Sequence, residues 1–576
     1  MFLPTTPEEV KRCGWDALDI ILVSGDSYID SSYIGVAVIG KFLAQAGFRV
    51  GIIAQPDCTT DPEIGRLGEP RLFWGVTAGC VDSMVANYTA LKKRRKSDDY
   101  TPGGVNNRRP DRASIVYTNL IRRFSKRIHP GTPARPVVLG GIEASLRRVP
   151  HYDFWSNQIR RSLLFDAKAD YLLYGMAEKS ALEFATAMRD GTDPQTVRGV
   201  CYIAKEKRAG YQELPSYEAV VANKLAFIEM FHAFYQNNDP VSATGLCQQH
   251  GDRWYVQNPP PLSETEAELD AVYALDYERA QHPYYERQGP VKALETIRFS
   301  IATHRGCYGE CNFCAIGVHE GRTIRSRSAA SIVREAEKLT HHPQFKGNIH
   351  DLGGPTANMY GFECDHKLQH GSCAHKRCIF PTVCSQMPVN HQPIVEILRQ
   401  VRELPGVKKV FVASGIRYDM VLNDRRHGDE YLRELVTHHV SGQLKVAPEH
   451  TTDLVLNKMG KPGTDSLIQF KAKFDDLTRA AGKPQFLTYY MIAAHPGCTD
   501  EDMAELKRFT SQKLQMNPEQ VQIFTPTPST YSTLMYYTEM DPFTHEPIQV
   551  EKDLYRKERQ KEIVTCKPSQ RNFHSH

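Results

Sequence analysis

The sequence has no long apolar run and no recognisable export signal. Residues 1–9 lack the basic stretch and apolar segment of a secretory signal, and no run of about 18 apolar residues occurs elsewhere. We therefore expect a cytoplasmic protein without a membrane partner.

Nor does the sequence have a strong charge imbalance or a disulfide framework. A net charge of +4 selects no class of partner by itself. The 14 cysteines are scattered or grouped in metal-like spacing, unlike those of small secreted domains. Positive charge does concentrate in residues 92–127. Such runs are usually solvated faces, and an anionic or nucleic-acid partner is the alternative.

The most informative feature present is the spacing Cys307-x-x-x-Cys311-x-x-Cys314. Three thiolates on one short loop can hold three corners of a cubic [4Fe–4S] cluster and leave the fourth iron open. An open iron can bind a ligand by exchange, and the amino and carboxylate groups of S-adenosylmethionine (SAM) are suited to chelating it. A structural zinc loop is the alternative, although it normally uses four Cys or His ligands in paired knuckles.

The N-terminal part alternates strand and helix patterns. These patterns cover residues 19–24, 33–46, 49–54, 136–140 and 170–174. They predict an α/β domain over residues 1–190 with a flavodoxin-like, doubly wound parallel sheet. Ligands of such sheets bind at the carboxyl ends of the strands.

Two stretches have weaker patterns. Residues 191–294 contain short β-like pieces and a run of three prolines, and are predicted to be a connector. Residues 541–576 are predicted to be a basic tail, disordered from residue 567 onward.

Residues 295–540 again alternate strands and helices. Predicted strands cover residues 297–302, 348–353, 410–415, 443–447, 486–493 and 521–524. Six β/α units predict a partial (β/α)6 barrel, with functional residues at the carboxyl ends of the strands.

The cysteine loop and two later motifs carry a resemblance to a known family. The motifs are Asp351-Leu-Gly-Gly-Pro-Thr-Ala-Asn-Met359 and Val446-Ala-Pro-Glu-His-Thr451. With these, residues 295–540 resemble the radical SAM superfamily, and the whole chain looks like the YgiQ-type radical SAM proteins. The resemblance implies an enzyme that cleaves SAM to a 5′-deoxyadenosyl radical, which abstracts hydrogen from an unknown substrate. It also implies a reductant such as flavodoxin or ferredoxin. A non-catalytic iron–sulfur or corrinoid-binding sensor is the rival interpretation.

The same resemblance implies roles for individual residues. The Gly353-Gly354 turn would hold the amino group of SAM, and Pro355 replaces the usual following glutamate. Glu449 would contact the ribose. Ser414 and Arg417 would contact the carboxylate or the ribose, or make ordinary loop hydrogen bonds.

The N-terminal domain resembles cobalamin-binding domains through its glycine turns at Val138–Ile142 and Tyr174–Glu178. The family's Asp-x-His motif appears here as Asp30-Ser31-Ser32, so the histidine that ligates cobalt from below is missing. Cobalamin is therefore not expected as a histidine-ligated cofactor, and a scaffold or substrate-binding role is predicted instead.

A second group of cysteines lies in an insert over residues 364–384. Its members are Cys364, Cys373, Cys378 and Cys384. Their density predicts a metal site, although the spacing fits no standard zinc knuckle. Structural zinc, an auxiliary iron–sulfur cluster and free thiols are the alternatives.

Overall fold

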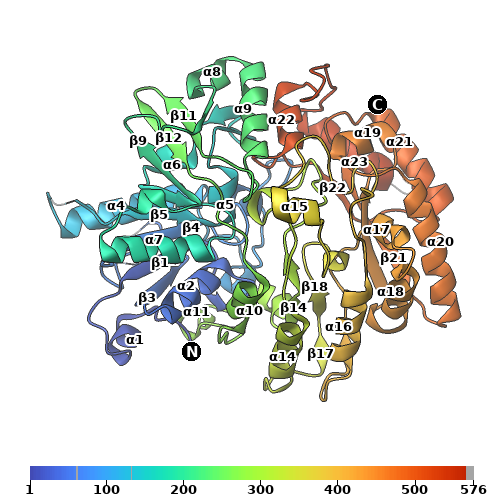
Figure 1. Ribbon diagram of the computed structural model, residues 1–576, viewed down its shortest axis with the longest axis horizontal. Helices are drawn as coiled ribbons and strands as arrows, with labels where there is room; N and C mark the ends of the chain where they lie inside the picture. The colour runs from blue at the N-terminus through green and yellow to red at the C-terminus, as the bar shows by residue number, and fades with distance from the viewer. Residues whose placement is uncertain (60–62, 132, 566–576) are drawn as a thin grey trace, which may run out of the picture. The chain divides into compact units, whose positions relative to one another are not determined.

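The computed structural model describes residues 1–59, 63–131 and 133–565 and divides into two compact units (Figure 1). The first unit comprises Met1–Arg298 together with Val318–Glu320, and the second comprises Phe299–Gly317 and the chain from Gly321 onward. Within the described ranges, no helix combines the length and apolarity needed to cross a membrane. The disorder predicted from residue 567 lies outside the described residues.

A nine-stranded sheet forms the centre of the first unit. Its parallel strands are β1 (Ile20–Ser24), β3 (Val50–Ala54), β4 (Phe73–Thr77), β5 (Val137–Gly140) and β8 (Tyr171–Leu173). They lie in the order β3-β1-β4-β5-β8. Numbered along the chain, this is the order 2-1-3-4-5, which is common among doubly wound sheets. The unit is therefore a mixed α/β structure built on a parallel sheet.

Strand β4 was not predicted from the sequence. Gly75 lies in its middle and interrupts the apolar pattern. A Cβ at Gly75 would lie 2.6 Å from a methyl carbon of Leu22 on the neighbouring strand β1. The glycine that hides this strand in the sequence thus permits its close packing in the sheet.

Residues 191–294 are not a mere connector, which corrects the prediction. They add four strands to the same sheet: β9 (Val200–Ala204), β10 (Gln212–Leu214), β11 (Leu246–His250) and β12 (Arg253–Gln257). Strand β9 pairs antiparallel with β8, and β12 pairs antiparallel with both β9 and β11. These strands are short and carry polar residues such as Gln248 and Gln249, so their hydrophobic period is weak.

The second unit is a series of parallel strands separated by helices. The strands are β14 (Ser300–Ala302), β17 (Asn348–Ile349), β18 (Asp351–Gly353), β19 (Lys409–Val410), β20 (Gln443–Glu449), β21 (Phe486–Ala493) and β22 (Val521–Ile523). Pairing is parallel between β14 and β18, β17 and β19, β20 and β21, and β21 and β22. Because the strands are parallel, the loops after them meet at one edge.

Helices cover the outer surface of this series and supply its core. Helix α14 (Ala329–Thr340), α16 (Gln392–Arg402) and α20 (Asp465–Ala480) each bury one apolar face. Their buried side chains join those of the strands in a single hydrophobic cluster. This packing fixes the strand ends from which the candidate site is built.

The basic tail contains a packed helix before residue 566. Helix α23 (Leu554–Thr565) packs against α21 (Asp500–Phe509) and buries Val564 completely. The ammonium group of Lys557 donates to the hydroxyl of Tyr536 at 2.9 Å. Because this segment is highly charged, its sequence gives no sign that some of its side chains are buried.

Candidate functional site

The first two sulfurs of the loop from Cys307 to Cys314 lie close to Gly309. A Cβ at Gly309 would lie 3.1 Å from the sulfur of Cys307 and 3.8 Å from that of Cys311. Glycine therefore keeps this space free of side-chain atoms. Burial, and then the charges of the other two cysteines, raise the pKa of Cys314 well above its usual range. Three partly buried thiols that repel one another as thiolates suit a cationic group that binds all three.

In residues 1–59, 63–131 and 133–565, no group of three Cys, His, Asp or Glu side chains is arranged to hold one metal ion. A tetrahedral zinc ion with bonds of about 2.3 Å would bring its sulfurs within about 4 Å of one another. The choice between a cluster and zinc at this loop therefore rests on the spacing of the three cysteines in the sequence.

The main chain of the loop is held from both ends. The N–H of Cys307 donates to the carbonyl of Gly321 at 3.2 Å. The N–H of Asn312 donates to the carbonyl of Met459 at 2.8 Å, and its side-chain amide donates to that of Lys458 at 2.8 Å. These two carbonyls lie at the C-terminal end of α19 (Asp453–Met459), which leaves them free of intrahelical partners.

The cysteine-rich insert also fastens this loop. The guanidinium of Arg377 donates to the carbonyl of Glu310 at 2.9 Å and to the side-chain oxygen of Asn312 at 2.7 Å. The ammonium of Lys367 donates to the carbonyl of Arg322 at 2.7 Å. Arg377 and Lys367 were not predicted, because nothing in the spacing of the insert marks an anchor for segments that lie 45 to 67 residues away in sequence.

The four cysteines of the insert differ in their surroundings. Cys364, Cys378 and Cys384 pack beside a small core that includes Tyr308 and Phe362, and Cys373 is exposed. The described residues hold no group of three side chains placed to bind one metal ion. Structural zinc, an auxiliary cluster and free thiols therefore stay the three predicted alternatives for the insert.

Two cations lie near the loop. Arg417 pairs with Asp419 through Nε at 2.8 Å and Nη2 at 2.7 Å. Its remaining nitrogen, Nη1, lies 3.5 Å from the position that a Cβ at Gly309 would take. Lys461 lies 3.7 Å from the carboxylate of Glu449 and donates to the carbonyl of Ala447 at 2.8 Å. Arg417 therefore places a nitrogen donor close to the first two sulfurs of the loop.

The Gly353-Gly354 turn follows β18 and contacts His304, which was not predicted as a site residue. A Cβ at Gly354 would lie 2.5 Å from Cε1 of the His304 ring. The ring is fixed by Thr303, whose hydroxyl lies 2.8 Å from Nδ1 of His304. Gly354 is thus required by the packing of the turn. In the sequence, the one sign that His304 belongs to the site is its position three residues before Cys307.

Ser414 and Glu449 have different local settings. The hydroxyl of Ser414 donates to the carboxylate of Asp351, which also accepts the N–H of Ser414 at 3.1 Å. Ser414 therefore makes the ordinary loop hydrogen bond that was its alternative interpretation. Glu449 has a φ of 69°, in the left-handed region, and burial raises its pKa. A strained, buried carboxylate at a strand end is typical of functional sites.

Replacing Gly354 by alanine should destabilise the second unit by about 1–3 kcal/mol and weaken SAM binding, because the new methyl group overlaps the His304 ring. Denaturant unfolding and equilibrium dialysis with SAM measure the two effects. Adding His304→Ala should restore part of the stability of Gly354→Ala by removing the overlap. A Gly354→Ala variant as stable as the parent would show that this contact does not restrict the turn.

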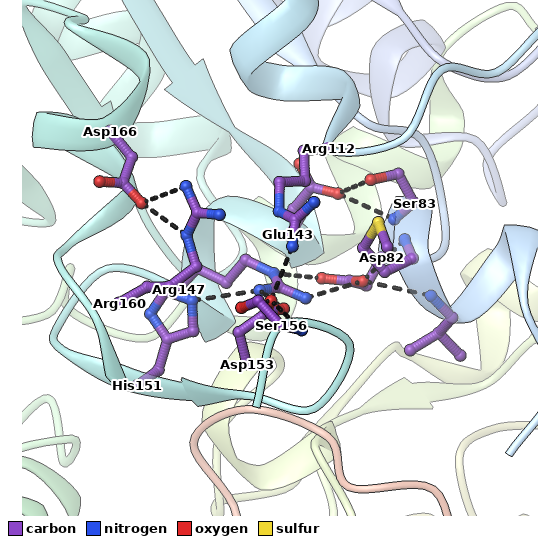
Figure 2. A network of polar contacts seen from close by, with 12 residues as sticks. Asp82, Ser83, Arg112, Glu143, Arg147, His151, Asp153, Ser156, Arg160 and Asp166 are labelled. Atoms are coloured by element: carbon purple, nitrogen blue, oxygen red, sulfur yellow. Dashed lines mark hydrogen bonds and ion pairs between the residues drawn. The ribbon is translucent and has the colours of Figure 1, made fainter. Parts of the chain in front are cut away.

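The carboxyl ends of β4 and β5 in the first unit hold a buried network of charges (Figure 2). Arg147 contacts Asp82 at 2.6 Å and Asp153 at 3.3 Å. The carboxylate of Glu143, just after the predicted Gly140-Gly141 turn, accepts the N–H of Ser83 at 2.8 Å. The predicted ligand edge is thus occupied here by contacts among the protein's own side chains.

The loop after β1 also has internal partners. The carboxylate of Asp30 lies 2.7 Å from the ammonium of Lys41 and accepts the N–H of Glu278 at 3.0 Å. Ser32 occupies the place of the expected histidine. The aspartate of the Asp-x-His pattern therefore serves the fold of this unit.

Comparison with known proteins gives consecutive matches along the chain. Residues 2–300 match the family "Radical SAM N-terminal", residues 301–510 match "Radical SAM superfamily", and residues 519–570 match a domain of unknown function, DUF3362. A UPF0313 protein of Fusobacterium nucleatum subsp. nucleatum is 56% identical, covering 99% of this chain and 100% of that protein. One from Thermotoga petrophila is 48% identical, covering 98% and 99%.

Two solved structures show weaker similarity. The radical SAM methyltransferase TsrM from Kitasatospora setae, with cobalamin and a [4Fe–4S] cluster bound, is 16% identical with a TM-score of 0.47, covering 90% of this chain and 77% of that one. The cobalamin-dependent SAM radical enzyme OxsB is 11% identical with a TM-score of 0.48, covering 94% and 58%. At such scores the similarity says nothing about what this chain binds.

The radical SAM match implies a [4Fe–4S] cluster and SAM as cofactors, and an enzyme whose reaction the matches do not specify. The near-complete coverage of the UPF0313 relatives confirms the resemblance drawn from the motifs. The chain belongs to the UPF0313 family of YgiQ-type radical SAM proteins.

Proposed function

We propose that this chain is a radical SAM enzyme in which Cys307, Cys311 and Cys314 hold a [4Fe–4S] cluster with one open iron. The observation that carries the proposal is that two cysteine sulfurs and Nη1 of Arg417 all lie within 4 Å of the point that a Cβ at Gly309 would occupy. When bound, the cluster and SAM supply a one-electron cleavage that yields a radical able to abstract hydrogen from a substrate. The protein itself binds and orients SAM and the substrate, and it excludes water from the site.

The residues near the loop suit the groups of SAM. The carbonyl of Gly353 already accepts the N–H and the hydroxyl of Thr303, at 2.7 and 3.1 Å. The carbonyl of Gly354 is therefore the acceptor that the turn offers to the SAM ammonium group. Nη1 of Arg417 is placed to donate to the SAM carboxylate, and Glu449 to accept from the ribose hydroxyls.

Asp419 supports this arrangement by positioning Arg417. Its carboxylate accepts hydrogen bonds from Nε and Nη2 of Arg417. Nη1 is then left beside Gly309 and the first two cysteine sulfurs. The paired carboxylate also offsets the charge of a guanidinium that is only 7% exposed. Ser414 is less suited to a SAM contact, because its hydroxyl proton is given to Asp351.

Residues 92–127 suggest an anionic substrate, but Arg94 lies 3.6 Å from Asp111 and Arg122 pairs with Asp170 at 2.5 Å. Part of the positive charge is thus neutralised within the first unit. For the sheet of that unit we propose a scaffold or substrate-binding role without a histidine-ligated corrinoid. The electron donor would be a protein such as flavodoxin or ferredoxin.

Reductive cleavage of SAM tests the proposal and separates an enzyme from a sensor. Anaerobically reconstituted protein, given dithionite and SAM, should form 5′-deoxyadenosine and methionine in equal amounts, measured by liquid chromatography and mass spectrometry. S-adenosylhomocysteine, which has no sulfonium, is the control and should yield neither. Protein that carries a full cluster but forms no 5′-deoxyadenosine would favour the sensor.

A further inference from the structure

The hydroxyl of Thr356 contacts a cysteine of the loop. Thr356 lies two residues after the Gly353-Gly354 turn, and its Oγ1 lies 3.6 Å from the sulfur of Cys307. Among the residues that the structure describes, this sulfur is the hydroxyl's one hydrogen-bond partner. The N–H of Gly309 donates to the same sulfur at 3.4 Å. Two donors therefore meet at one of the three sulfurs.

The direction of the Thr356 hydrogen bond follows from the chemistry of the sulfur. A free thiol could donate or accept, whereas a thiolate bound to iron has no proton and can only accept. With a cluster in place, the Thr356 hydroxyl must donate. Hydrogen bonds to cluster sulfurs stabilise the more negative, reduced state and are one of the means by which proteins set cluster potentials.

We propose that Thr356 raises the reduction potential of the cluster by donating a hydrogen bond to the sulfur of Cys307. This rests on the proposed function, because it takes Cys307 as a cluster ligand. Reduction of the cluster precedes cleavage of SAM, so a higher potential lets a weaker electron donor drive the reaction. Thr356 is thus a tuning residue that acts through Cys307.

The turn before Thr356 explains why this side chain is available. Pro355 has no N–H to give and a fixed φ, so it contributes no donor of its own. Thr356 is extended, with φ −141° and ψ 113°, and is followed by the short turn of helix Ala357–Met359. The sulfur of Met359, at the end of that turn, lies 3.8 Å from the Cys307 sulfur. Thr356 and Met359, both in this short segment, therefore contact the same cysteine sulfur.

A redox titration of the full-length, anaerobically reconstituted protein, followed by electron paramagnetic resonance, tests the proposal. Thr356→Val keeps the shape of the side chain and removes the donor, so its cluster potential should be more negative than that of the parent. Thr356→Ser keeps the hydroxyl and should have a potential close to the parent's. At a fixed donor potential, Thr356→Val should also form 5′-deoxyadenosine more slowly and recover with a stronger reductant.

Iron content separates the outcomes. A Thr356→Val protein with the parent's iron content and an unchanged potential would overturn the proposal. If that variant holds less iron, Thr356→Ala is titrated in its place, and equal potentials for the Ala and Ser variants would overturn it. A parent protein that binds no cluster at all would instead refute the proposed function, which keeps the two failures distinct.

Discussion

Replacing Cys307, Cys311 and Cys314 together by alanine should give a folded protein that holds no loop cluster and forms no 5′-deoxyadenosine. The three thiols are the proposed anchors, and alanine offers iron no ligand. The loop should keep its backbone, because it is held by hydrogen bonds from Asn312 and Arg377 rather than by the sulfurs. Iron analysis and product detection measure the two losses.

A control and a contrary result complete this test. Cys13, exposed at the end of α1 (Pro7–Arg12), is far in sequence from the loop, and Cys13→Ala should leave iron content and product unchanged. Undiminished product from the triple variant would refute the assignment of the three cysteines. Iron retained without product would point to the cysteines of the insert, Cys364, Cys373, Cys378 and Cys384, as a second cluster site.

Replacing Arg147 by alanine should destabilise the first unit by about 3–5 kcal/mol, because it leaves buried carboxylates without their cation. Asp82 and Asp153, the two partners, are 2% and 0% exposed (Figure 2). The measurement is the change in the urea concentration at the midpoint of unfolding of the first unit. The matched control is Arg160→Ala, which removes a partly exposed pair with Asp166 and should cost less than about 1 kcal/mol.

The same substitution should change the dependence of stability on pH. Burial acts to raise the pKa of Asp153, but Arg147, the Ser156 hydroxyl and Arg112 outweigh it, so the pKa lies below its usual range. A lowered folded pKa contributes stability above the unfolded pKa of about 3.9, and that stability is lost as the pH falls through the folded value. Below about pH 4 the parent should therefore lose stability faster than Arg147→Ala. Parallel curves for the two proteins would show that Arg147 does not set this pKa.

The sequence predicted those helices and strands whose apolar residues recur with a clear period. In the first unit, strands β1, β3, β5 and β8 lie within one residue of their predicted bounds. In the second unit, the strand predicted over residues 297–302 begins only at Ser300, and the one predicted over residues 410–415 overlaps β19 at Val410 alone. Short β-like pieces were expected within residues 191–294, but β10 and β11 were missed because their polar residues give no strong period. The helix over Leu554–Thr565 was missed because its contacts, not its composition, stabilise it.

The candidate site divides in a similar way. The three cysteines and the two glycines stand in short motifs, so their sequence spacing was enough to find them. The partners that shape the site come from distant segments: His304 against Gly354, Asp351 against Ser414, and Arg377 against Asn312. Such contacts depend on tertiary packing, and no single-sequence pattern records them.

The most direct test of the central claim is the electron paramagnetic resonance spectrum of the reduced protein with and without SAM. A cluster held by three cysteines has one open iron, and binding of SAM to that iron changes its electronic environment. The account predicts a [4Fe–4S] signal that shifts when SAM is added, and predicts that the Cys307→Ala, Cys311→Ala, Cys314→Ala triple variant lacks this SAM-sensitive signal. A full cluster signal that stays identical at saturating SAM would contradict it.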